Sequence, residues 1–432
     1  MMLKHILNDI EQSKEDLIQG LMELISLESS DGKATNAQTF VEKELKELGF
    51  EVSTFKGIDE RCLNLDDYCP LEHPFHPEAY NVVGEFHSES DQPSLLLFGH
   101  IDTESEDYFG HFDDPYKPEF YDGKIYGLGA SDDKGGIAMM LYALKFIKKH
   151  LKTLPFNCTV LSILGKHGGA AGTLSALVKG YRADYGIYLH PAETGHGFAE
   201  IKNISLGAID LNIRVCGKPG KKHDDLDPGT NANVLISQIA LWLEEFNQLM
   251  RNKYHFDFGS FNDEPSFILN IGSITSDAGY GGIAQNAEMK VRVRFFFPLS
   301  VNDVIEQIKQ FLQEKTTSSS IIDFSQITIE KGPLRASPAI VKTESEFVQM
   351  IQKHIHEETG ICQFIHQYHG GSDIRLPILY GDCQCVGIGP SCHLPEQNSN
   401  QKEWISVDDY LTGVNILARI LYHFQDFKKT SE

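Results

Sequence analysis

Apolar positions near the N-terminus recur with the spacing of an amphipathic helix, and we predict helices over residues 5–26 and 36–48. Further along, short unbroken apolar runs alternate with helical segments such as 135–150. The runs predict buried strands at 94–98, 159–164 and 185–189. Buried strands separated by helices are typical of an α/β sheet with helices on both faces. Ligands bind such sheets beyond the C-terminal ends of the strands, so the residues after each run are the candidates for chemistry.

The pattern changes near residue 206. Half-buried alternating strands and amphipathic helices follow in turn, at 209–215, 231–250, 289–295 and 301–314. This succession predicts an α+β insert over 206–316. The α/β pattern then resumes, with strands near 325–330 and 384–388 and a final helix over 407–424. We therefore expect a discontinuous α/β domain, 1–205 and 317–432, that is interrupted by the insert.

The chain carries 38 basic and 61 acidic side chains, for a formal net charge of −23. Such a chain repels nucleic acid and anionic membranes, so neither is an expected partner. No apolar stretch approaches the about 20 residues that span a bilayer, and we recognise no signal peptide. The eight cysteines include no CxxC pair, so we expect reduced thiols in a cytoplasmic protein.

Two polar motifs follow the first buried run. His100 and Asp102 are two residues apart, which suits a metal-binding imidazole whose second nitrogen is held by a carboxylate. Residues 127–136 then form a glycine-dense loop, with Asp132 and Asp133 where a helix begins. Taken singly, the first motif also fits a structural histidine and the second a helix N-cap. In succession they indicate a metal site.

Together these motifs resemble peptidase family M20, which includes acetylornithine deacetylase, succinyl-diaminopimelate desuccinylase, aminoacylase and carboxypeptidase G2. The acetylornithine deacetylase branch is the most similar, and the resemblance extends over essentially the whole chain. It implies a zinc-exopeptidase-like three-layer α/β domain with an inserted α+β ferredoxin-like lid that usually dimerises. It also implies that His100 binds one metal ion, that Asp102 orients it, and that Asp132 bridges two ions.

Several acidic positions of the family are replaced in this chain. After the second buried run the family has two adjacent glutamates, where this chain has Lys166 and His167. By the resemblance, Lys166 takes the position of the general base and His167 that of a metal-binding carboxylate. A third carboxylate, which precedes a proline, is replaced by His190. The last histidine of the family corresponds to His393 or, in another alignment, to Ser399.

These replacements change the charge of the site. The expected ligand set carries a single negative charge. It consists of His100, Asp132, His167, His190 and His393. Two divalent ions would be poorly neutralised there, so we expect one tight ion. Imidazole remains a good ligand for zinc, nickel and copper, and we expect zinc. Lys166 leaves three alternatives: a neutral base, a charged lysine that pairs with Asp133 and ends hydrolysis, or a cation that holds a substrate carboxylate.

Further positions of the family are retained in the insert and near the C-terminus. Residues 217–223 resemble the lid motif whose histidine polarises the scissile carbonyl in the partner subunit's site, which makes His223 the oxyanion candidate. Arg294 matches the arginine that binds the substrate carboxylate, and Asn286 is a weak substitute for the lid asparagine. Gly371 lies in a stretch that resembles the family's Gly-Gly-Thr-Asp loop, whose backbone approaches the substrate.

The resemblance therefore implies a metal-dependent amide hydrolase, a deacylase or peptidase acting on N-acyl amino acids or small peptides that carry a carboxylate. Its catalytic residues would be Lys166, Asp102 and His223, in a homodimer formed through the lid. Two alternatives remain open. One is a binding or regulatory protein that no longer hydrolyses its ligand. The other is a non-hydrolytic reaction in the same pocket, such as amide formation or an elimination.

Overall fold

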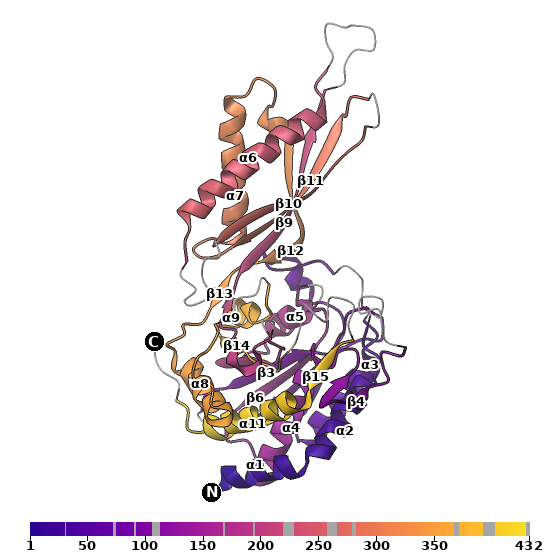
Figure 1. Cartoon of the computed structure of the whole chain (residues 1–432), viewed down its shortest axis with the longest axis vertical. Helices are drawn as coiled ribbons and strands as arrows, with labels where there is room; N and C mark the ends of the chain where they lie inside the picture. The colour runs from indigo at the N-terminus through magenta and orange to yellow at the C-terminus, as the bar shows by residue number, and fades with distance from the viewer. Residues whose placement is uncertain are drawn as a thin grey trace. The chain divides into compact units, whose positions relative to one another are not determined.

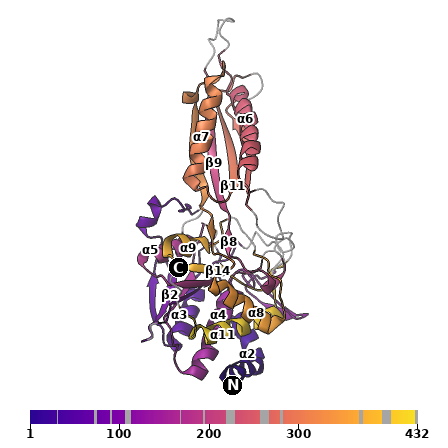
Figure 2. The same cartoon turned by 90° about the vertical axis from the view of Figure 1, so that its left-hand side faces the viewer.

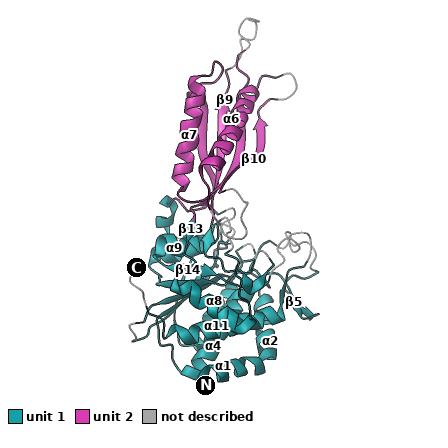
Figure 3. Ribbon diagram, turned by 60° about the vertical axis from the view of Figure 1, so that its left-hand side comes forward, with its two compact units in different colours: residues 1–65, 71–205, 339–432 teal, residues 66–70, 206–338 magenta. Residues whose placement is uncertain are grey.

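The computed structural model describes residues 1–30, 32–71, 75–89, 92–105, 113–166, 169–192, 195–218, 229–256, 266–278, 282–366, 371–391 and 402–428. The chain divides into two compact units (Figure 3). Unit 1 comprises residues 1–65, 71–205 and 339–432, and unit 2 comprises residues 66–70 and 206–338.

Unit 1 is built around a mixed sheet with the strand order β1-β2-β6-β3-β7-β14. Its strands are β1 (Glu51–Phe55), β2 (Asn81–Phe86), β3 (Leu95–His100), β6 (Cys158–Ile163), β7 (Tyr185–Tyr188) and β14 (Gln384–Gly387). β6, β3, β7 and β14 are parallel, whereas β2 is antiparallel to both of its neighbours. The parallel strands therefore end at one common edge, where the sequence motifs begin.

Helices cover both faces of this sheet (Figure 1). Along β3, Leu95 and Leu97 face one hydrophobic core, and Leu96 and Phe98 face the other. All four side chains are fully buried, which explains the unbroken apolar run. The larger core includes α1 (Met2–Gln12), α2 (Lys14–Ile25), α3 (Thr35–Glu47), α4 (Lys134–Leu151), α8 (Glu346–Thr359) and α11 (Val407–Phe424). The smaller core lies under α5 (Ala171–Lys179) and α9 (Arg375–Gly381).

Short elements complete unit 1. The predicted helix over 5–26 is two helices, because Ser13 leaves the helical conformation with φ −98° and ψ 14° between α1 and α2. A small sheet is formed by β4 (Glu119–Tyr121), β5 (Lys124–Tyr126) and β15 (Trp404–Ser406), and a separate pair by β8 (Ile204–Ser205) and β13 (Ala339–Ile340). Short 3-10 helices are η1 (Glu60–Asn64) and η3 (Gly197–Ala199).

Unit 2 is an antiparallel sheet with the strand order β10-β11-β9-β12, covered on one face by two helices (Figures 1 and 2). Its elements in chain order are β9 (Gly207–Cys216), α6 (Ala232–Lys253), β10 (Phe267–Ser276), β11 (Asn286–Phe295), α7 (Val301–Thr317), η4 (Phe324–Gln326) and β12 (Ile327–Ala336). This strand–helix–strand, strand–helix–strand order with that sheet order is the ferredoxin-like topology. The expected α/β domain with an α+β insert is therefore confirmed.

The boundaries of unit 2 differ from the expected insert at 206–316. The strand predicted near 325–330 belongs to unit 2, because β12 pairs with β9 and Ile327 lies opposite Val215. Residues 66–70 also belong to it, since Asp66 accepts hydrogen bonds from Lys331 Nζ at 3.1 Å and Asn302 Nδ2 at 2.7 Å. Apolar alternation predicts a strand but not the sheet that it joins.

Among the described residues, no helix is both long and apolar enough to cross a membrane. The cysteines in the same part of the chain are free thiols, and most of them are buried.

Candidate metal centre

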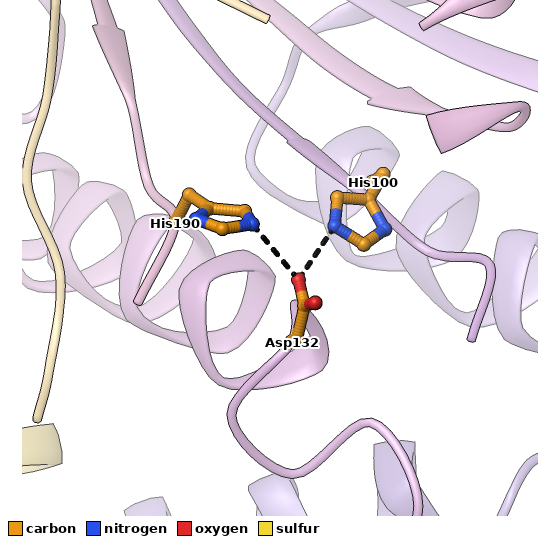
Figure 4. Close-up of side chains that lie close together, drawn as sticks. All are labelled: His100, Asp132 and His190. Atoms are coloured by element: carbon orange, nitrogen blue, oxygen red, sulfur yellow. Dashed lines mark hydrogen bonds and ion pairs between the residues drawn. The ribbon is translucent and has the colours of Figure 1, made fainter. Parts of the chain in front are cut away.

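Three side chains meet at the edge where the parallel strands end. His100 is the last residue of β3, and His190 follows β7, its neighbour in the sheet. Asp132 lies in the turn that leads into α4. Figure 4 shows both imidazole rings directed at the Asp132 carboxylate. Sheet order thus assembles residues that are widely separated in the sequence.

The distances within this group fit a common metal ion. Asp132 Oδ1 lies 2.8 Å from His100 Nε2 and 3.1 Å from His190 Nε2. One ligand atom from each residue lies within 4.8 Å of the others. Ligands bound to zinc at about 2.0–2.2 Å lie about 3.3 Å apart in a tetrahedral arrangement. Two imidazoles and one carboxylate are also a donor set that zinc accepts.

Burial and charge define the state of the three groups without an ion. Burial lowers the pKa of His100, but attraction to Asp132 and hydrogen bonds with Asp102 and Asp132 outweigh it and raise this pKa well above its usual value. Burial and the charge of Lys202 lower the pKa of His190 to about 4. His100 therefore carries a proton opposite Asp132, while His190 is neutral. A metal ion must displace the His100 proton, so binding weakens as the pH falls.

The backbone carbonyl of Asp102 lies closer to the His100 ring than the Asp102 carboxylate does. The carbonyl oxygen lies 2.9 Å from His100 Nδ1, whereas Asp102 Oδ1 lies 3.6 Å from the same nitrogen. The other carboxylate oxygen accepts hydrogen bonds from the backbone N–H groups of Gly165 at 3.0 Å and Lys166 at 3.1 Å. Asp102 therefore fixes both the imidazole and the turn that carries Lys166.

Lys166 is held by a partner that the sequence did not indicate. Its Nζ lies 2.6 Å from Asp373 Oδ1, and the two side chains are 12% and 1% exposed. Burial raises the pKa of Asp373, but the charge and hydrogen bond of Lys166 outweigh it and hold this pKa below its usual value. Asp133, which one of the three alternatives gave as the partner of Lys166, accepts a hydrogen bond from the His100 backbone N–H at 3.2 Å. The Lys166–Asp373 pair is therefore an ammonium and a carboxylate.

Asp373 lies in the glycine-containing stretch that resembles the family loop. The carbonyl of Gly371 accepts a hydrogen bond from Arg375 Nη1 at 3.1 Å. The fully buried Arg375 also donates through Nη2 to the carbonyl of Gly169 at 3.2 Å. This guanidinium joins the loop that carries Asp373 to the turn that carries Lys166.

Glu403 is a site residue that sequence reasoning missed. It is 1% exposed, and its carboxylate accepts hydrogen bonds from the backbone N–H groups of Gly129 at 2.6 Å, Ser131 at 2.9 Å and Asp132 at 2.9 Å. Burial raises the pKa of Glu403 to about 7. The only signal in the sequence is an acidic residue directly before the apolar pair Trp404 and Ile405.

Removing this anchor should loosen the turn that carries Asp132. We expect Glu403→Ala to lower the free energy of unfolding by about 1–3 kcal/mol, because buried N–H groups lose their acceptor. Urea unfolding measures the change. Glu119→Ala removes an exposed carboxylate on β4 and serves as a matched control, with an expected change within about 0.5 kcal/mol. Equal stabilities of the two variants would exclude the anchoring role.

Of the remaining candidates, only Asn286 and Arg294 are among the described residues. His167, His223 and His393, together with the alternative Ser399, lie outside the described residues. Asn286 and Arg294 are the first and ninth residues of β11 in unit 2. Arg294 is exposed, and Asn286 Nδ2 donates to Asp277 Oδ2 at 2.8 Å.

Comparison with known proteins places this chain in a family. Residues 96–423 match the sequence profile of peptidase family M20/M25/M40. The chain is 32% identical over 327 residues to N-formyl-4-amino-5-aminomethyl-2-methylpyrimidine deformylase of Bacillus subtilis (strain 168), covering 72% of this chain and 70% of the relative. The chain belongs to peptidase family M20/M25/M40, a family of amide-cleaving hydrolases.

Solved structures show the same fold. A tripeptidase from Staphylococcus aureus superposes with a TM-score of 0.70 at 18% identity, over 96% of this chain and 99% of that one. A dinuclear metal-binding peptidase of the M20 family from Bacillus subtilis gives a TM-score of 0.65 at 13% identity, over 95% and 98% of the two chains.

Proposed function

We propose that this protein is a metal-dependent amide hydrolase that removes acyl groups from amino acids or small peptides carrying a carboxylate. The observation that carries the proposal is the convergence of His100 Nε2, His190 Nε2 and Asp132 Oδ1 at the strand ends of an M20 fold. We propose zinc as the ion and one tight site. By the resemblance, His167 and His393, or Ser399 in its place, would complete the metal surroundings.

The described residues have distinct roles in this proposal. His100, Asp132 and His190 would hold the divalent ion, which would supply Lewis-acid polarisation of the amide carbonyl. The Asp102 carbonyl keeps the His100 ring in its binding orientation. Lys166 Nζ retains its proton against Asp373, so it binds an anionic oxygen of the substrate and does not act as a general base. His223, Arg294 and Asn286 would contact the substrate, as their counterparts in the family do.

The names of two relatives suggest which acyl group to test first. Two relatives, at 32% and 29% identity, are N-formyl-4-amino-5-aminomethyl-2-methylpyrimidine deformylases, from Bacillus subtilis and Halalkalibacterium halodurans. We therefore place N-formyl amines first in a substrate series, followed by N-acetyl and N-succinyl amino acids and by dipeptides.

The test is turnover of this series by protein freed of metal and then reloaded with zinc, cobalt, manganese or nickel. Mass spectrometry detects the released amine, and elemental analysis gives the metal content per chain. We expect metal-dependent product from the wild type, and loss of both product and bound metal in His190→Ala. Absence of metal uptake by the wild type would exclude the proposal.

A second candidate function is ligand binding without hydrolysis, and the Lys166–Asp373 ion pair favours it. The pair puts a protonated lysine where the family has its general base, and loss of a positioned base commonly costs about 10²–10⁴-fold in rate. A ligand of the series that raises the melting temperature of the metal-loaded protein without product would identify this function.

We also propose that the protein is a homodimer formed through unit 2. On α6, Val234, Leu241 and Leu249 are 56%, 67% and 52% exposed, and helical spacing puts them on one face. β10 is an edge strand of the unit 2 sheet, and its Ile274 is 46% exposed. An apolar helix stripe beside an open sheet edge is a surface suited to a second copy of the chain.

We expect Leu241→Glu/Leu249→Glu to convert the dimer to a monomer, because charges on the stripe oppose its burial. Light scattering after size-exclusion chromatography gives the mass. Leu63→Glu, which changes an equally exposed leucine of unit 1, is the control and should remain dimeric. A monomeric wild type would contradict the proposal.

A further inference from the structure

Lys202 places a buried cation directly behind one of the candidate metal ligands. Its side chain is 2% exposed, and its Nζ lies 3.0 Å from His190 Nδ1. The same Nζ donates to the carbonyl of Pro191 at 2.5 Å and lies 3.8 Å from the carboxylate of Glu200, which is 1% exposed. The backbone of Lys202 is fixed by two hydrogen bonds of 2.8 Å with Gly387, at the end of β14.

This contact is unusual for a histidine that binds metal. A ligating imidazole normally donates its second N–H to a carboxylate or a carbonyl group, which leaves the lone pair of the first nitrogen for the ion. A lysine ammonium has three donors and no acceptor. The hydrogen bond from Lys202 Nζ therefore requires the lone pair on His190 Nδ1 and puts the ring proton on Nε2.

In that tautomer His190 is a hydrogen-bond donor and not a metal ligand. Its Nε2–H points to Asp132 Oδ1 at 3.1 Å, and the chain Lys202–His190–Asp132 is satisfied without an ion. A second arrangement uses the same atoms. His190 Nδ1 also lies 3.2 Å from the carbonyl oxygen of Pro191, which accepts the ring proton when Nε2 faces an ion.

We propose that Lys202 is a positioning residue that controls metal occupancy at His190. It stabilises the tautomer in which His190 donates to Asp132, and its charge opposes a divalent ion on the other side of the ring. The inference rests on the proposed metal site and deepens it. The ion at His100, Asp132 and His190 is consequently held less tightly than the three ligands would hold it without Lys202.

The test measures metal affinity and not turnover, so it is independent of the substrate. Full-length protein is freed of metal and titrated with Zn²⁺ by calorimetry and with Co²⁺ by visible absorption. We expect Lys202→Met, which keeps the apolar stem, to bind both ions at least about ten-fold more tightly, the size of effect that groups behind a ligand commonly have. Lys202→Arg retains a charged donor and should bind both ions with the affinity of the wild type.

Lys148→Met is the matched control. Lys148 is another lysine of unit 1 whose Nζ donates to a backbone carbonyl, that of Leu48, and we expect its loss to leave metal affinity unchanged. In the wild type without metal, long-range ¹H–¹⁵N spectra should show His190 protonated at Nε2. In Lys202→Met they should show the proton at Nδ1.

The outcomes separate this inference from the proposed function. Unchanged or weaker metal binding by Lys202→Met, with wild-type circular dichroism, would overturn the role of Lys202 even if the wild type hydrolyses its substrates. Should Lys202→Met fail to fold, the wild-type spectrum decides alone, and a proton on Nδ1 would overturn the inference. Tighter binding by Lys202→Met without any turnover would support the inference while the proposed hydrolase fails.

Discussion

Asp132→Asn should reduce the affinity for zinc by more than about 100-fold, beyond the usual effect of groups that only contact a ligand. One carboxylate oxygen of Asp132 lies close to Nε2 of both His100 and His190. Asp132 is also the only acidic residue among these three candidate ligands. Asparagine keeps the size and shape of the side chain but removes the negative charge. Metal content after dialysis and calorimetric titration measure the loss.

The matched control for this variant is Asp382→Asn. Asp382 is an exposed residue at the end of α9, and its φ of 51° suits asparagine as well as aspartate. We expect the control to retain the metal content and turnover of the wild type. Asp132→Asn that still holds zinc with wild-type affinity would show that the described group is not the metal centre.

Lys166→Met should lower the free energy of unfolding by about 3–5 kcal/mol, because it leaves the carboxylate of Asp373 buried without its cation. Lys166→Met/Asp373→Asn should regain most of this stability, since it removes the unpaired charge as well. Urea unfolding of the two variants and of the wild type gives the coupling between the residues. Lys43→Met, from an exposed pair with Glu47, should change stability by no more than about 0.5 kcal/mol.

The loss of stability in Lys166→Met should depend on pH in a defined direction. The pKa of Asp373 is lower in the folded protein than its ordinary value, so the ion pair stabilises the fold above the pKa of the unfolded chain, about 3.9. This stabilisation is lost as the pH falls through the folded pKa. The stability difference between the wild type and Lys166→Met should therefore shrink in acid, and a difference that persists there would contradict the ionic origin.

The sequence predicted those parts of the fold that local pattern determines. The apolar run at 94–98 became β3, because a strand buried on both faces needs apolar side chains at every position. It did not predict that β12 joins the sheet of unit 2, since pairing with β9 is a tertiary contact that leaves no local pattern. The break at Ser13 was also missed, because apolar periodicity continues across it.

The candidate site, too, could be predicted from the sequence only where local motifs mark its residues. His100, Asp132 and His190 each follow a recognisable strand or glycine-rich loop, so the motifs could place them together. Lys166 pairs with a residue 207 positions away, which no spacing argument reveals. Glu403 and Lys202 were missed because a charged residue beside an apolar run is ordinarily a surface residue.

The pairing of β8 with β13 has a consequence for how this protein can be altered. Ser205, the last residue before unit 2, lies opposite Ala339, the first residue after it, in an antiparallel ladder. Facing residues in such a ladder are about 5 Å apart, a gap that a two-residue hairpin closes. Residues 206–338, which make up most of unit 2, therefore begin and end at neighbouring positions of unit 1. We expect that this segment can be deleted, or replaced by that of a relative, by joining the chain at these two positions. The strand order around His100 and His190 would be preserved.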